Sequence, residues 1–337
     1  MSYSSELHLD AKPEAGFAWR SRLSQLGARF FSFPGFTRLR PYARKLFLVT
    51  EPAGRVYVRH LPAAPTLREC DNLTVISANL WHDWPLHRHL TDRLEGFARL
   101  VEQFQADVLL LQEVVRLPGF HADEWLAERL GMAGAYSRAN GHQAGIGFEE
   151  GVAVLSRFPI GGLEIKQLGS GSNPFVRRLG LGATIHSPCG PVMAFTVHLS
   201  LSPRKNATQL ADLFSWVAKV AREKVALIGG DFNAAEGSPQ IHSARSRWLD
   251  TFRYLHPERD GTTHELRLPW GNILRRARLD YIFMHSNRPR WSILEAAHLK
   301  KAERGHSDHH AVLLRISPIF APQNHAISQR DIRSAIY

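Results

Sequence analysis

The sequence has little cysteine: Cys70 and Cys189 are the only two among its 337 residues. Two cysteines form neither a disulfide framework nor a zinc cluster, so the composition favours a reducing compartment such as the cytoplasm. No stretch reaches the roughly 18 apolar residues that a transmembrane helix needs. The N-terminus has no basic region followed by an apolar run, as a secretory signal would have. We therefore expect a cytoplasmic monomer without a transmembrane segment.

Two common catalytic motifs are also absent. The sequence has no Gly-rich nucleotide-binding loop and no serine placed between glycines at a strand-to-helix turn. Neither cysteine belongs to the polar set described below. These absences argue against a covalent mechanism through serine or cysteine and favour attack by water with the help of a metal.

Acidic residues are missing from one segment. Between Ala15 and Thr50 there are seven basic residues and no acidic one, while the whole chain has a net charge of +11. The segment is rich in aromatic residues, and Pro34 and Pro41 prevent a single helix. It predicts either a peripheral contact with a membrane or single-stranded nucleic acid, or an extension that covers a flank of the main domain.

The length suits one large α/β domain or two small ones. From Leu73 onward, short apolar strand-like runs alternate with helical apolar spacing, most clearly over residues 86–104 and 207–220. The predicted organisation is a basic, aromatic-rich extension and linker at 1–70, a catalytic domain at 71–317 and a C-terminal tail at 318–337.

Polar side chains follow the apolar runs of this domain where each run ends. Buried carboxylates at strand ends are costly unless they pair or bind a metal, so several together indicate a site. Taken singly, each has an ordinary alternative as a cap, a turn or a satisfied core residue. In chain order the candidates are Asn79, Glu113, His198, Asp231, Asn233, Asp280 (inside a strand), Asp308 and His309.

The residue types favour hydrolysis of a phosphate ester. Oxygen ligands from Glu113, Asp308 and the amide of Asn79 suit Mg²⁺ or Mn²⁺ better than Zn²⁺. Asp231 is the candidate that orients and deprotonates water. Asn233, two residues further on, can hold the water or a phosphate oxygen.

Histidines complete the predicted site. His198 and His309 can donate hydrogen bonds to phosphoryl oxygens near neutral pH. A catalytic histidine needs a carboxylate that fixes its tautomer, and Asp280 is the candidate partner of His309. His306 and His310, without cysteines nearby, are interpreted as scaffold rather than as zinc ligands.

Seven motifs carry these residues: Ala78-Asn79-Leu80, Leu111-Gln112-Glu113-Val114, Gly151-Val152-Ala153-Val154-Leu155-Ser156-Arg157, Val197-His198-Leu199, Gly230-Asp231-Phe232-Asn233, Arg278-Leu279-Asp280-Tyr281-Ile282 and Ser307-Asp308-His309. Together, and in this order, they resemble the endonuclease/exonuclease/phosphatase superfamily, to which DNase I-like enzymes belong. The resemblance implies a four-layer αββα sandwich, with two packed, mainly antiparallel sheets flanked by helices. It also implies a Mg²⁺-dependent phosphodiesterase or phosphomonoesterase. The implied roles are the metal for Asn79, Glu113 and Asp308, the phosphate for His198, the water for Asp231 and Asn233, and support of His309 for Asp280.

The sequence departs from the abasic-site nucleases of this family. Those enzymes place an Asp two residues after the first Asn, where this chain has Trp81, and this weakens a DNA-repair function. Trp81 and Trp84 either form a wall against a base or lipid headgroup or pack beneath the first helix. Glu149 and Glu150 replace a Tyr before the Gly151 strand, and Glu150 is a candidate secondary contact.

We predict a Mg²⁺-dependent hydrolase of phosphodiester bonds, either nuclease-like or acting on a phospholipid headgroup. The main body is only mildly basic, which argues against tight binding of a duplex. The alternatives are a phosphomonoesterase of the inositol-phosphatase type and a non-catalytic protein that binds nucleic acid or a membrane.

Overall fold

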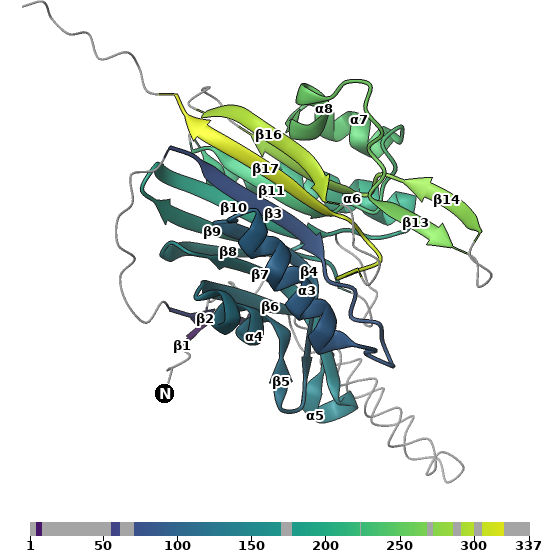
Figure 1. Ribbon diagram of the computed structural model, residues 1–337. Helices are drawn as coiled ribbons and strands as arrows, with labels where there is room; N and C mark the ends of the chain where they lie inside the picture. The colour runs from purple at the N-terminus through teal and green to yellow at the C-terminus, as the bar shows by residue number, and fades with distance from the viewer. Residues whose placement is uncertain are drawn as a thin grey trace, which may run out of the picture.

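The computed structural model describes residues 5–8, 55–60, 71–169, 177–222, 224–267, 272–285, 291–299 and 305–319 (Figure 1). The basic segment 15–50 lies outside these residues, as does most of the predicted tail 318–337. No helix in the described part is both long and apolar enough to cross a lipid bilayer.

The larger sheet has nine strands, in the order β1-β2-β6-β7-β4-β3-β17-β16 with β5 beside β4. Val56 and Val58 of β2 are buried in the core, so the boundary predicted at residue 71 leaves out a strand of this sheet. The strands are β1 (Ser5–His8), β2 (Arg55–Arg59), β3 (Leu73–Asn79), β4 (Val108–Leu117), β5 (Phe120–His121), β6 (Ala133–His142), β7 (Phe148–Ser156), β16 (Trp291–Leu299) and β17 (Ala311–Pro318).

The second sheet has six strands, in the order β12-β15-β11-β10-β9-β8, and β13 and β14 form a separate hairpin. Cys189 lies in the turn between β9 and β10 and is disulfide-bonded, which contradicts the expectation of reduced cysteines. The strands are β8 (Ile160–Gln167), β9 (Leu179–Ser187), β10 (Gly190–His198), β11 (Ala226–Asp231), β12 (Leu249–Asp250), β13 (His264–Arg267), β14 (Ile273–Ala277) and β15 (Asp280–His285).

The two sheets pack face to face, and helices cover their outer faces (Figure 1). Leu110 of the larger sheet and Leu227 of the smaller one share the apolar cluster between the sheets. Phe97 of α3 packs on the outside of the larger sheet, and Leu213 of α6 on the outside of the smaller one. The predicted sandwich is therefore confirmed. The helices are α3 (Leu90–Gln103), α4 (Ala122–Leu130), α5 (Gln143–Ile146), α6 (Pro203–Ala221), α7 (Pro239–Arg245) and α8 (Thr251–Leu255).

Helix α3 begins at Leu90, four residues later than the helical spacing predicts. The helix does not begin earlier because four residues of the loop 80–89 have a positive φ near 50°, which is not helical. They are Trp81, Asp83, His87 and His89. Arg93 of α3 holds the loop by donating hydrogen bonds from Nη1 to the carbonyls of Leu80 and Trp81. The loop that follows Asn79 is thus fixed against the first helix.

Gly229 lets β11 lie close to the larger sheet. A methyl group at this position would lie 2.6 Å from the side chain of Leu110 and 3.1 Å from that of Ser77. Leu110 lies in β4, three residues before Glu113, and Ser77 lies in β3, two residues before Asn79 at the end of that strand. The close approach therefore brings Asp231, two residues after Gly229, toward Glu113 and Asn79.

Candidate active site

In each sheet, the strand register places predicted site residues on neighbouring strands beside one another. In the smaller sheet, His198 of β10 is opposite Asp231 of β11, which is opposite Asp280 of β15. In the larger sheet, Asn79 of β3 is opposite the residue that precedes Glu113. Asn79 Nδ2 donates to Asp231 Oδ2 at 3.2 Å and so joins the two rows.

Glu113 sits where β4 departs from regular pairing. The register between β4 and β7 shifts between Leu111 and Val114, and Glu113 has a φ of 51°. Asn233 has a similar φ of 48°. Non-glycine residues rarely adopt this left-handed conformation, and they do so mainly where surrounding contacts hold them at a functional site.

The amide of Asn79 orients two carboxylates. Its Nδ2 donates to Glu113 Oε1 at 3.1 Å as well as to Asp231, while its Oδ1 accepts from the backbone N of Trp81 at 2.9 Å. Because the Trp81 amide fixes this orientation, nitrogen and not oxygen faces the carboxylates. The sequence predicts Asn79 as a metal ligand, and in this structure its amide is hydrogen-bonded to Glu113 and Asp231.

Asp231 is buried among hydrogen-bond donors. Asn233 donates from its backbone N to Oδ1 at 2.8 Å and from Nδ2 to Oδ2 at 3.2 Å. His198 Nε2 lies 3.5 Å from Oδ2. Burial, together with the charge of Asp280, raises the pKa of Asp231 to about 7. A carboxylate that titrates near neutral pH suits a general base.

His309 and Asp280 form a buried pair. His309 Nδ1 lies 2.8 Å from Asp280 Oδ2, and the hydroxyl of Thr263 donates to the same oxygen at 2.7 Å. Burial alone would lower the pKa of His309, but the charge of Asp280 outweighs it and the pKa rises to about 10. Asp280 therefore holds Nδ1 as a donor and leaves Nε2 for another contact. Thr263 was not predicted from the sequence.

His198 differs from His309 in charge. Burial, together with the nearby charge of Arg178, lowers the pKa of His198 well below its usual range. His198 is therefore neutral at neutral pH. It can donate a hydrogen bond to a phosphoryl oxygen but adds no positive charge.

Asp308 lies beside two imidazoles. Its Oδ2 is 3.9 Å from His264 Nε2, and the ring centroids of His264 and His309 are 4.5 Å apart. His264, which starts β13, was not predicted, because it reaches the site through a hairpin. Ligand atoms of Asp308, His264 and His309 lie within 4.8 Å of one another, and Glu113 belongs to a second such group with His82 and Glu150.

His82 links Glu113 to Glu150. Its backbone N donates to Glu113 Oε2 at 3.2 Å, and its Nε2 lies 3.1 Å from Glu150 Oε2. The backbone N of Trp84 donates to Nδ1 of His82 at 3.0 Å, so the ring proton is on Nε2. The ring is therefore a donor to Glu150 and does not offer Nε2 to a metal. Although burial opposes it, this hydrogen bond holds the pKa of Glu150 at about 2.

The two tryptophans have different environments. Trp81 packs against the first helix, with the guanidinium of Arg93 4.9 Å from its ring centroid. Trp84 is exposed, and its ring centroid lies 6.4 Å from that of Phe148 in β7. Trp84 is thus the more exposed of the two, whereas Trp81 is half-buried.

The family model described as "Endonuclease/Exonuclease/phosphatase family" matches residues 76–297. The chain belongs to this family. The match confirms the resemblance seen in the sequence motifs, and members of the family are hydrolases of phosphoesters. No curated protein matches the chain in sequence.

Several solved structures share the fold of this endonuclease/exonuclease/phosphatase protein. A family member from Beutenbergia cavernae is 22% identical, with a TM-score of 0.58, over 74% of this chain and 72% of that one. D. rerio TDP2, complexed with a single strand DNA product, is 18% identical, with a TM-score of 0.59, over 74% and 100%. The Bacteroides thetaiotaomicron mannosyl-6-phosphatase is 17% identical, with a TM-score of 0.56, over 72% and 99%. At these identities the likeness shows the fold alone.

The donor set fits the divalent cation on which enzymes of this family generally depend. Glu113 and Asp308 offer carboxylate oxygens, which suit Mg²⁺ or Mn²⁺. Burial raises the pKa of Glu113, and the negative charges of Glu150 and Asp308 raise it further. A cation would relieve this repulsion between carboxylates.

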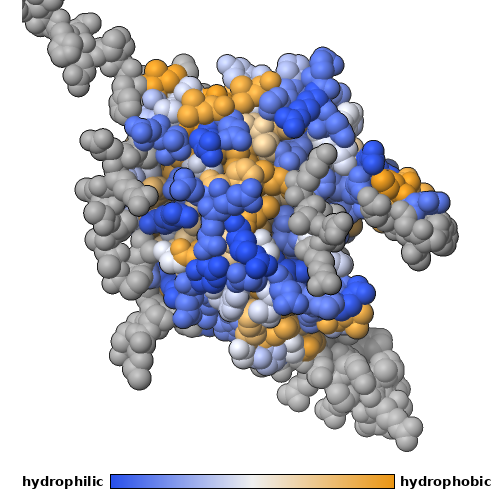
Figure 2. Space-filling view, in the orientation of Figure 1, coloured by the Kyte–Doolittle hydropathy of each residue, from blue (hydrophilic) through white to orange (hydrophobic). Residues whose placement is uncertain are grey.

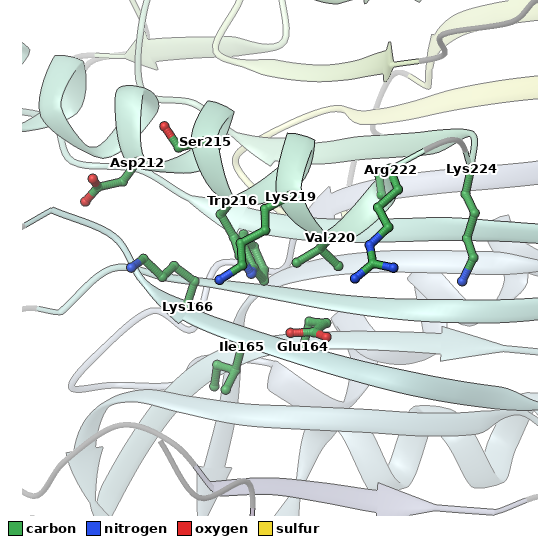
Figure 3. Close-up of a pocket in the computed structure, with 11 residues that line it drawn as sticks. Glu164, Ile165, Lys166, Asp212, Ser215, Trp216, Lys219, Val220, Arg222 and Lys224 are labelled. Carbon is green, nitrogen blue, oxygen red and sulfur yellow. The ribbon is translucent and has the colours of Figure 1, made fainter. Parts of the chain in front are cut away.

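A groove of about 950 Å³ opens between β8 and α6 (Figure 3). Lys166, Lys219 and Lys224 line it together with Glu164 and Asp212. None of the predicted site residues lines this groove, so it is separate from the candidate active site.

Proposed function

We propose that this chain is a Mg²⁺- or Mn²⁺-dependent phosphodiesterase that uses water as the nucleophile. The observation that carries the proposal is the convergence of Asp231 and the His309–Asp280 pair, at strand ends, with Glu113, at the register shift of β4, which Asn79 joins to Asp231. Membership of a family of phosphoester hydrolases supports it. The complex of TDP2 with a DNA product is consistent with a diester substrate.

Each residue has a distinct task in this proposal. Asp231, with its pKa near neutrality, accepts a proton from the attacking water, and Asn233 keeps its carboxylate in place. His309 donates from Nε2 to a phosphoryl oxygen while Asp280 holds Nδ1. His198 adds a neutral donor. Glu113 and Asp308 would hold the cation, which supplies charge neutralisation at the phosphate when bound.

Turnover of bis-p-nitrophenyl phosphate with Mg²⁺ and then with EDTA tests the proposal. We expect release of nitrophenol with Mg²⁺ and almost none with EDTA. Asp231→Asn and His309→Gln should each lower kcat by at least 100-fold without a large change in melting temperature. A folded wild type that shows no metal-dependent turnover would reject the proposal. Faster hydrolysis of p-nitrophenyl phosphate would favour the phosphomonoesterase alternative, for which the fold of mannosyl-6-phosphatase is the precedent.

A further inference from the structure

Exposed apolar side chains gather on the segments that border the candidate active site. Of the eleven large apolar side chains exposed in the described residues, seven lie on these segments. They are Trp84, Leu86, Ile146, Leu201, Leu266, Ile273 and Leu274, and we call them the apolar rim.

Each part of the rim is close in sequence or space to a site residue. Trp84 and Leu86 belong to the loop after Asn79, and Leu201 comes three residues after His198. The β13–β14 hairpin begins at His264, whose ring contacts His309. Figure 1 shows the hairpin projecting from the body of the molecule on the same side as the loop 80–89, and Figure 2 shows hydrophobic surface on it.

The hairpin does not pack its apolar residues on the core. Residues 273–276 of β14 are all exposed, so neither face of this strand is covered. The two strands are joined by their antiparallel backbone pairing and by an ion pair between Glu265 and Arg276 at 3.0 Å. A two-stranded hairpin alone is marginally stable in water. Leu274, exposed to 62% on such an element, is therefore suited to contact a partner.

The chemistry of the rim favours lipid over nucleic acid. Six of its seven side chains are Leu or Ile, which present no ring for a base to stack on. Interfaces with DNA are polar and strongly positive. Segments that lie in a membrane interface combine apolar side chains with nearby cations, and Arg275 and Arg276 directly follow Leu274.

We propose that the apolar rim docks on a phospholipid bilayer and that the substrate is the phosphodiester of a phospholipid headgroup. This inference rests on the proposed phosphodiesterase function. The rim enters the headgroup layer around the site, the arginines of the hairpin face lipid phosphates, and the diester of a lipid is presented to the site without leaving the bilayer.

Sedimentation of the full-length chain with phosphatidylcholine vesicles, with and without phosphatidylserine, tests the docking. The variant Leu86→Ser with Leu274→Ser removes two rim residues. The control is Leu249→Ser with Leu294→Ser, which makes the same exchanges at exposed leucines on β12 and β16. We expect the rim variant to bind vesicles at least tenfold more weakly and the control to stay within twofold of wild type. No vesicle binding by wild type, or equal losses in both variants, would overturn the docking.

Two further measurements separate the parts of the inference. Turnover of soluble bis-p-nitrophenyl phosphate should be equal in wild type, rim variant and control, and its absence in wild type would reject the phosphodiesterase but not the docking. Release of a phosphorylated headgroup from the vesicles should occur with wild type and fall at least tenfold in the rim variant. Wild type that binds vesicles but releases no headgroup would overturn the lipid substrate. If the rim variant instead loses binding of a single-stranded oligonucleotide, the rim serves nucleic acid.

Discussion

Thr263 and His309 share one oxygen of Asp280. The Thr263 hydroxyl lies 2.7 Å and His309 Nδ1 2.8 Å from Asp280 Oδ2. Thr263 Oγ1 also accepts hydrogen bonds from the backbone N of Leu279 at 2.9 Å and of Asp280 at 3.1 Å. One buried hydroxyl therefore fixes both the backbone and the carboxylate that hold the histidine.

Replacing Thr263 with Val should damage the site while the shape of the side chain stays nearly the same. The loss of the hydroxyl leaves Asp280 with one donor fewer and two backbone N–H groups without their acceptor. Removing a side chain that holds a site residue in place without touching the substrate typically costs roughly 10- to 100-fold in activity. We expect kcat for a soluble diester to fall by that amount in Thr263→Val and to recover in Thr263→Ser. Equal activity of the two variants would show that the hydroxyl is unimportant.

Glu113→Gln should stabilise the metal-free protein and abolish the rise in melting temperature that Mg²⁺ causes. Burial and the charge of Glu150 raise the pKa of Glu113, so a neutral amide relieves an unfavourable charge. Thermal unfolding in EDTA and in Mg²⁺ measures both effects. We expect Mg²⁺ to raise the melting temperature of wild type, since a ligand of the native state stabilises it, but not that of Glu113→Gln. Glu164→Gln, on β8, is the control and should respond as wild type does.

His298 should make the fold sensitive to mild acid. Its ring stacks on Phe252 at 3.9 Å, and burial lowers its pKa to about 3. An unfolded histidine titrates near 6.5. Between pH 6.5 and about 3 the unfolded chain therefore binds a proton that the folded chain does not, and the free energy of unfolding decreases as the pH is lowered. The loss amounts to at most about 1.4 kcal/mol per pH unit.

The variant His298→Leu isolates this effect from the titration of carboxylates. Its free energy of unfolding, measured in urea at pH 7 and pH 5, should fall less between the two values than that of wild type. His242→Leu, at a histidine near the end of α7, serves as the comparison. Parallel pH dependence of wild type and His298→Leu would contradict a neutral, half-buried His298.

Arg278 and Asp250 should show strong energetic coupling. Arg278 Nη1 and Nη2 contact Asp250 Oδ2 and Oδ1 at 2.9 and 2.7 Å, and both side chains are buried. Removing one partner of such a pair is costly, because the other charge stays buried with only its second partner, Arg245 for Asp250 and Glu236 for Arg278. In a double-mutant cycle, Arg278→Met with Asp250→Leu should cost clearly less than the sum of the single changes. Additive costs would mean that the two side chains act independently.

The sequence predicts best the residues that end buried strands. Asp231 and His198 were found because each ends an apolar run, and the register across β10 and β11 sets them opposite each other. The pairing of Asp280 with His309 was predicted because a catalytic histidine needs a carboxylate that fixes its tautomer. The family and the two-sheet fold were predictable because the motifs keep their order along the chain, and the family model and the sheet topology confirm both.

Other features of the site depend on contacts between separate segments of the chain, which local sequence patterns do not predict. His82 reaches Glu113 because Trp81 and Asp83 adopt left-handed backbone, which is unusual for such residues. His264 arrives through the β13–β14 hairpin. The orientation of the Asn79 amide depends on the backbone N of Trp81, which donates to Oδ1 and leaves Nδ2 facing the carboxylates.

Asp231 ends the strand that pairs in parallel with β10 and in antiparallel fashion with β15. A deletion of one residue within β11 would turn its last side chain to the opposite face and detach it from both neighbours at once. An insertion or deletion inside β10, β11 or β15 would therefore have to be matched in all three strands to keep His198, Asp231 and Asp280 opposite one another.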